Sequence, residues 1–95
     1  MKNIKVTWKA FGESPIHNEY ITSVEFYWDT DLSALEICEQ IFQDTNKYSG
    51  AMWDTIEPML SDKRTHTALS VGDEVEVNGV TYRCEGFGWL QLVSQ

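Results

Sequence analysis

Few side chains in this sequence have the types and spacing that chemistry needs, and His66 is the first to consider. It lies between two threonines, with Asp73 a few positions later, so an acid–base site at this end of the chain is one hypothesis. A nucleophile, a base and an orienting group must approach to about 3 Å, which these spacings do not specify. We predict no catalytic residues and a non-enzymatic protein. The alternative is a small enzyme or ligand-binding domain centred on His66, Asp73 and Trp89.

Thiols and carboxylates form no recognisable metal site. Cys38 falls in an expected helix and Cys84 in an expected strand, with no second Cys or His at ligand spacing. Asp29 and Asp31 precede the expected helix, where carboxylates favour the dipole by roughly 0.3–1 kcal/mol, so capping is preferred to metal binding. We predict two reduced thiols, no metal and no cofactor.

Charge is the strongest compositional signal. The chain has 15 acidic and 7 basic residues and a net charge of −8. Residues 12–57 hold ten of the acids but only one base, Lys47. Such a field repels nucleic acid and anionic lipid and attracts basic proteins. We expect no direct nucleic-acid binding, no membrane binding and a basic protein partner, unless the acidity serves solubility alone.

The expected partner-binding surface combines carboxylates with an aromatic ring. The most specific form of this hypothesis is a nucleic-acid mimic that inhibits a host defence protein, with carboxylates where phosphates would lie. Four tryptophans are more than a small core readily buries, so one or two are expected in a binding patch. The candidate residues are Glu25, Asp29, Asp31, Glu36, Glu39, Asp44 and Trp53.

Residues 74–83 predict a tight β-hairpin. A type I′ turn needs two successive positive φ values, which Asn78 followed by Gly79 adopts at least cost. The two-residue loop sets the register, with these expected pairs: Val77 with Val80, Glu76 with Thr81, Val75 with Tyr82 and Glu74 with Arg83. After the hairpin, glycines on both sides of Phe87 bend the chain into a further strand over residues 89–93.

The rest of the chain predicts one α+β domain covering residues 1–95. Alternating apolar residues indicate strands over residues 3–11 and 20–28. Ser33 and Glu36 fit a capping box for a helix that ends near residues 46–50, and residues 51–59 suggest a short second helix. The expected apolar side of the long helix contains Leu35, Cys38, Ile41 and Phe42, with Ile37 beside them. We expect a small, mostly antiparallel sheet of about five strands with this amphipathic helix packed on it.

The chain carries no signal for a membrane or for export. Residues 1–6 alternate from the start and lack an apolar signal core, and no apolar run approaches the length of a membrane span. We therefore expect a cytoplasmic protein.

The last third of the chain resembles a known family. The run His66-Thr67-Ala68-Leu69-Ser70-Val71-Gly72-Asp73, the valine-rich hairpin and the closing Gly86-Phe87-Gly88-Trp89 are similar to the C-terminal segment of the YodL-like family. They also resemble small accessory proteins of phages and conjugative elements. The resemblance implies an accessory protein of mobile DNA without an established enzymatic role, so it transfers no functional residues.

Overall fold

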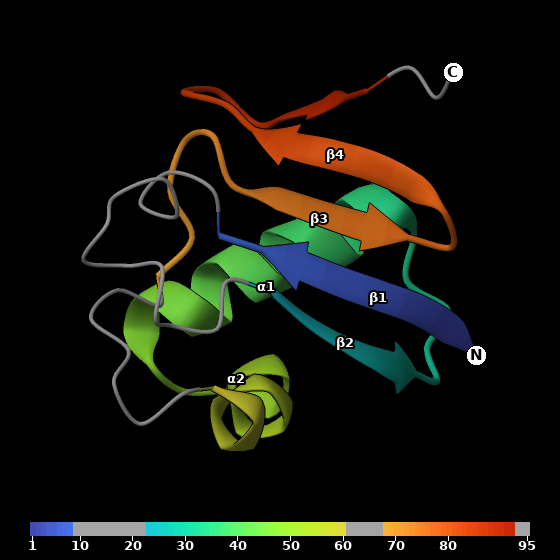
Figure 1. Ribbon diagram of the computed structural model, residues 1–95, viewed down its shortest axis with the longest axis vertical. Helices are drawn as coiled ribbons and strands as arrows, with labels where there is room; N and C mark the ends of the chain where they lie inside the picture. Colours follow the sequence, from blue (N-terminus) through green and yellow to red (C-terminus); the bar gives the residue numbers. More distant parts are fainter. Residues whose placement is uncertain (9–22, 61–67, 93–95) are drawn as a thin grey trace.

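The computed structural model describes residues 1–8, 23–60 and 68–92 (Figure 1). Within these ranges the strands are β1 (Lys2–Thr7), β2 (Ser23–Trp28), β3 (Glu74–Val77), β4 (Val80–Cys84) and β5 (Trp89–Gln91). The helices are α1 (Ala34–Lys47), α2 (Ala51–Ile56) and the 3-10 helix η1 (Glu57–Met59). The predicted α+β class is confirmed, and so is the short second helix, which tightens to 3-10 geometry at Pro58.

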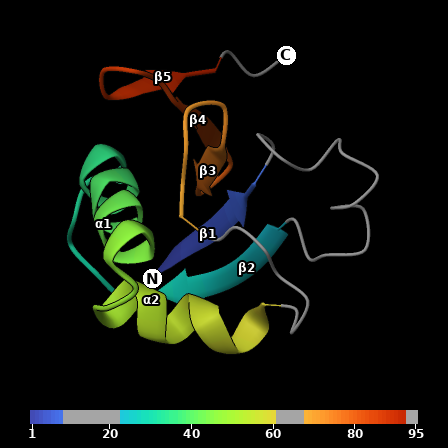
Figure 2. The same ribbon diagram turned by 90° about the vertical axis from the view of Figure 1, so that its left-hand side faces the viewer.

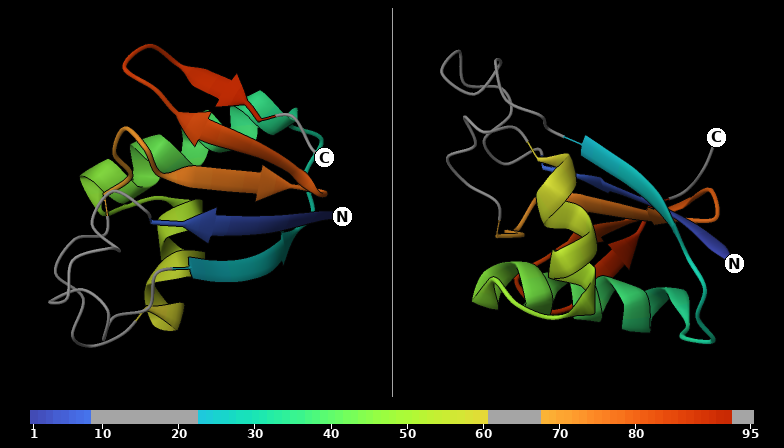
Figure 3. Two further views of the ribbon diagram at one scale, coloured as in Figure 1. Left: turned by 45° about the horizontal axis from the view of Figure 1, so that its top comes forward. Right: turned by 90° about the horizontal axis from the view of Figure 1, so that it is seen from below.

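The five strands form one antiparallel sheet in the order β2-β1-β3-β4-β5, which can be followed by colour in the left panel of Figure 3. β1 therefore lies between β2 and β3. Both helices cover the same face of this sheet, as seen in Figure 2. The opposite face is open in the part of the chain that the structure describes.

Strand alternation places the core between the sheet and the helices. Ile4 and Val6 of β1 are fully buried, while Lys5 between them is exposed on the open face. β2 is an edge strand and carries large side chains on both faces: Phe26 enters the core, and Tyr27 is 67% exposed. The strand contributions to the core are Ile4, Val6, Val24, Phe26, Val75 and Val77.

The β3–β4 hairpin has the predicted turn and register. Asn78 and Gly79 both have positive φ, at 50° and 87°. All four predicted residue pairs are found. The turn is also tied to β1, because the Asn78 amide donates to the Asn3 carbonyl and its side-chain oxygen accepts from the Asn3 amide, each at 2.8 Å. The register sets Glu74 opposite Arg83, although the Arg83 guanidinium binds Glu85 at 2.8 Å.

Gly79→Val is expected to lower the free energy of unfolding by more than about 1 kcal/mol, because a β-branched residue at positive φ is strained. A Cβ at Gly79 would meet nothing within 4 Å, so the loss would come from the backbone and not from a clash. The check is a thermal melt of both proteins. An unchanged melting temperature would argue against the type I′ turn.

Helix α1 begins at the predicted capping box. The Glu36 amide donates to Ser33 Oγ at 3.2 Å, and the Ser33 amide donates to Glu36 Oε1 at 3.0 Å. These bonds to Ser33 lower the pKa of Glu36, because they favour its ionised form. The helix ends where expected, but Tyr48 and not Asn or Gly adopts the left-handed conformation, with φ of 54°.

The buried side of α1 matches the predicted one in part. Cys38 and Ile41 are buried as expected, with Ile37 beside them. Leu35, which we expected in the core, is 51% exposed, and the buried side also includes Asp44 and Thr45. Polar side chains can occupy this side because each has partners there: Thr45 Oγ1 donates to the Ile41 carbonyl at 2.9 Å and accepts from the Leu69 amide at 3.2 Å.

Asp44 caps the start of α2 from the preceding helix. The N-cap residue of α2 is Gly50, which has no side chain to satisfy the first amides of the helix. Asp44 Oδ2 accepts from the Met52 amide at 3.0 Å in its place, and Oδ1 accepts from Gln40 Nε2 at 2.8 Å. Lys47 Nζ lies 3.7 Å from the same carboxylate. The hydrogen bond from the Met52 amide to Asp44 joins α1 to α2.

Candidate partner-binding surface

The predicted acidic residues do not share one surface. Glu36 and Glu39 are exposed on α1, whereas Glu25 is exposed on the open face of the sheet, away from the helices. Asp29 and Asp31 are exposed in the segment that leads to α1, and the helix cap there is Ser33 and not either carboxylate. The acids therefore divide between the helical side and the sheet side of the molecule.

Two predicted surface residues belong to the interior. Asp44 is fully buried, because its carboxylate caps α2, so its expected place on the solvent side of α1 was wrong. Trp53 is only 6% exposed, and its ring packs edge-on against Tyr48 with centroids 5.2 Å apart. Trp8 is buried as well, whereas Trp28 and Trp89 are half-buried.

The acidic residue of the alternative site is not exposed either. Asp73 is fully buried, and its Oδ2 accepts from the Ser70 amide at 2.9 Å, which closes the turn before β3. Its backbone carbonyl accepts from the Cys84 amide at 2.8 Å. His66 lies outside the described residues. Asp73 thus has a structural role, and the third residue of that set, Trp89, lies beside α1.

Two adjoining hollows mark the helical side of the molecule. The first is a wide depression along α1, lined by Leu32, Leu35, Glu36, Glu39, Gln40 and Gln43. The second is a smaller hollow of about 160 Å³ between α1 and the β4–β5 turn, lined by Glu39, Phe42, Cys84, Glu85, Gly86, Gly88 and Trp89. Glu39 lines both, and its Oε1 accepts from Trp89 Nε1 at 3.3 Å. This hydrogen bond links the helix to β5 where the hollows meet.

Exposed apolar side chains border these hollows, and sequence reasoning missed two of them. Phe87 is 100% exposed at the tip of the β4–β5 turn. Its signal was present in the sequence, because the two glycines that flank it predict a turn, and turns lie at the surface. Leu35 had no such signal, since its spacing matched the core side of the helix. We call Leu35, Glu36, Glu39, Glu85, Phe87 and Trp89 the α1–turn surface.

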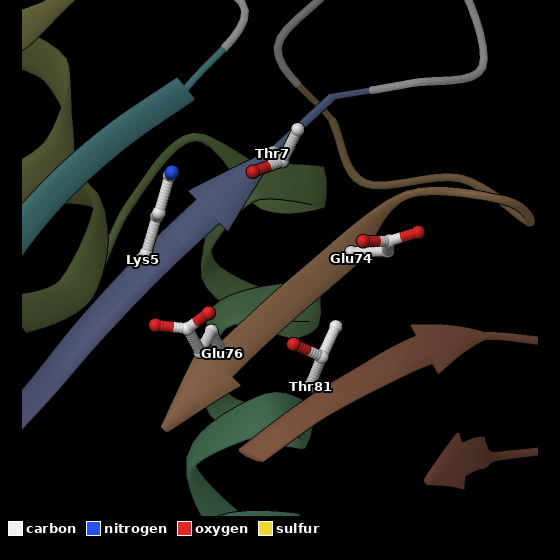
Figure 4. A pocket seen from close by; sticks show the side chains of 5 residues that line it. All are labelled: Lys5, Thr7, Glu74, Glu76 and Thr81. Carbon is white, nitrogen blue, oxygen red and sulfur yellow. The ribbon is translucent and has the colours of Figure 1, made fainter. Parts of the chain in front are cut away.

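A third hollow lies on the open face of the sheet (Figure 4). It has a volume of about 240 Å³ and is lined by Lys5, Thr7, Glu74, Glu76 and Thr81. In the strand register Lys5 faces Glu25 on one side and Glu76 on the other. Since a positive and a negative charge alternate across these strands, this face has less net charge to offer a basic partner than α1 does.

The thiols and acids offer no reactive or metal site in the described ranges. Cys38 and Cys84 are free and buried. Burial, with the Glu39 carboxylate nearby, raises the pKa of Cys38 to about 12, so the thiol stays protonated and is a poor nucleophile. Among residues 1–8, 23–60 and 68–92, no three Cys, His, Asp or Glu side chains are grouped to hold a metal ion. No helix in those ranges is long and apolar enough to cross a bilayer.

Comparison with protein-family models, curated proteins and solved structures finds no match to this chain. What the α1–turn surface can bind is therefore judged from its own geometry and charge.

Proposed function

We propose that this chain is a non-enzymatic binding protein and that its α1–turn surface binds a basic segment of a protein partner. The observation that carries the proposal is the position of Glu39, which joins two hollows bordered by further carboxylates and by exposed apolar side chains. Interfaces of this composition use apolar anchors for affinity and charges for orientation.

The apolar side chains supply the larger share of the expected binding energy. Full burial of a side chain such as Phe87 or Leu35 contributes roughly 1.5–3 kcal/mol. Exposed charges at a rim mainly raise the association rate and suppress wrong partners. Glu36 and Glu39 thus select a basic partner, and Phe87 and Leu35 hold it.

The nucleic-acid-mimic form of the proposal names a partner whose basic site otherwise holds DNA or RNA. Because Glu25 lies on the opposite face from Glu36 and Glu39, such mimicry would use the carboxylates of the α1–turn surface alone. If the protein is a nucleic-acid mimic, duplex DNA competes with it for its partner. If the protein binds a basic segment that does not hold nucleic acid, duplex DNA does not compete.

Neutralising Glu36 and Glu39 is expected to weaken partner binding about tenfold, equivalent to about 1.4 kcal/mol, with little effect on folding. Glu36→Gln with Glu39→Gln is the suitable double variant, because glutamine at the third helical position preserves the capping box. Partners are first captured from the native cell and identified by mass spectrometry. The affinity of one purified basic partner is then measured at about 50 and 200 mM salt, since screening should reduce the difference between the proteins.

The matched control changes two acids with the same spacing on the other helical segment. Asp54→Asn with Glu57→Gln removes the same charge from exposed positions at α2 and η1. This control should bind like the wild type. Equal affinities for all three proteins at both salts would refute a binding role for the acidic side of α1.

A further inference from the structure

The hollow between α1 and the β4–β5 turn has the size of a receptor for one side chain. Its volume is about 160 Å³. Pockets for cofactors or drug-sized molecules are roughly 300–1,000 Å³, so this one is too small for such ligands. Because it opens beside the exposed Phe87, a side chain of a docked segment could reach it.

The chemistry of the walls favours a cation. Glu39 and Glu85 contribute carboxylates, and Phe42 and Trp89 contribute aromatic rings. Carboxylates next to aromatic faces recognise cationic groups by ion pairing together with cation–π contact. The Cys84 thiol lines the same hollow, and burial and the nearby Asp73 and Glu39 carboxylates raise its pKa, so it adds no charge of its own.

The two carboxylates are already positioned to accept further donors. Trp89 Nε1 donates to Glu39 Oε1 at 3.3 Å, which fixes the carboxylate against the indole. Glu85 Oε1 accepts from Arg83 Nη2 at 2.8 Å and from Arg83 Nε at 3.2 Å. An ionised carboxylate has about four acceptor sites, so each retains capacity for a ligand. Because Arg83 occupies Oε1 of Glu85, a ligand would bond this carboxylate through Oε2.

We propose that this hollow binds the guanidinium of one arginine in a basic peptide segment, with the group stacked on Trp89 and hydrogen-bonded to Glu39 and Glu85. The proposal rests on the function proposed above and names the residue of the partner that is recognised. Arginine is favoured over lysine because its planar group stacks on aromatic rings and bonds carboxylates through two parallel donors.

The test is an NMR titration of the ¹⁵N-labelled full chain with the peptide acetyl-Ser-Gly-Arg-Gly-Ser-amide. Matched peptides carry lysine or the uncharged isostere citrulline in place of arginine. We expect the arginine peptide to shift the Trp89 indole N–H and the Gly86 and Gly88 amides saturably. The dissociation constant should be at least fivefold higher for the citrulline peptide. Trp89→Phe assigns the indole signal.

Two single variants separate this hollow from the rest of the molecule. Glu39→Gln should weaken arginine-peptide binding at least fivefold, whereas Asp54→Asn, which removes an exposed carboxylate of α2 outside the α1–turn surface, should leave it unchanged. Equal binding of the arginine and citrulline peptides, equal binding of the arginine and lysine peptides, or no saturable shift at Trp89 would each overturn the arginine assignment. If any of these occurs while partner capture still depends on Glu36 and Glu39, the proposed function stands and only the arginine site fails.

Discussion

Gly50→Ala is expected to lower the free energy of unfolding by roughly 3–4 kcal/mol, as the sum of backbone strain and a lost helix cap. Gly50 has φ of 107° and ψ of 169°, a region that side-chain-bearing residues avoid at a cost of about 1–3 kcal/mol. A Cβ there would also stand 2.5 Å from the Asp44 carboxylate carbon, so the carboxylate would have to move away from the Met52 amide. Urea unfolding followed by tryptophan fluorescence measures the loss.

Gly72→Ala is the matched control for this variant. Gly72 also has a positive φ, of 100°, but a Cβ there would meet nothing within 4 Å. Its loss should be limited to backbone strain, roughly 1–2 kcal/mol. Equal losses at the two glycines would show that the contact between Gly50 and Asp44 has no energetic importance.

Asp44→Ala is expected to cost roughly 2–3 kcal/mol, because it removes the cap of α2 and leaves a buried amide without its acceptor. The Met52 amide and the Gln40 side chain both donate to this carboxylate. Asp54→Ala removes an exposed carboxylate from α2 and should cost less than about 1 kcal/mol. The same urea titration compares the two, and similar losses would contradict the capping role of Asp44.

Combining Asp44→Ala with Gly50→Ala tests the contact directly. Without the Asp44 carboxylate, the alanine Cβ at position 50 no longer has the atoms that crowd it. The double variant should therefore lose less stability than the two single losses added together, by about 1 kcal/mol or more. Strict additivity would mean that the two sites act independently.

Sequence reasoning succeeded where a structure is determined by neighbours along the chain. The Asn78-Gly79 turn fixes the hairpin register within a few residues, and the Ser33–Glu36 box starts α1 with contacts three positions apart. It failed at Asp44, because a carboxylate at that position looks like an ordinary surface residue of a helix. Only the path of the chain after α1 brings the Met52 amide to it. Leu35 was also misplaced: it was expected on the buried side of α1 but is exposed.

The candidate surface was predicted in part. Glu36 and Glu39 were expected to be exposed together, and they are. Glu25 could not be assigned to the opposite face, because that requires knowing which side of the sheet α1 covers. Phe87 could have been identified from its flanking glycines. The hollow at Trp89 depends on a contact between α1 and β5, which are distant in sequence, so no local pattern reveals it.

The central position of β1 has a consequence for synthesis on the ribosome. Val6 pairs with Val24 on one side and with Val75 on the other. At translation rates of about 5–20 residues per second, the second partner emerges roughly 3–14 s after Val6 itself. During this interval the hydrogen-bonding edge of β1 that later meets β3 has no native partner, and an open strand edge invites pairing with other chains. The β3 side of β1 is therefore open to such pairing until the β3–β4 hairpin leaves the exit tunnel.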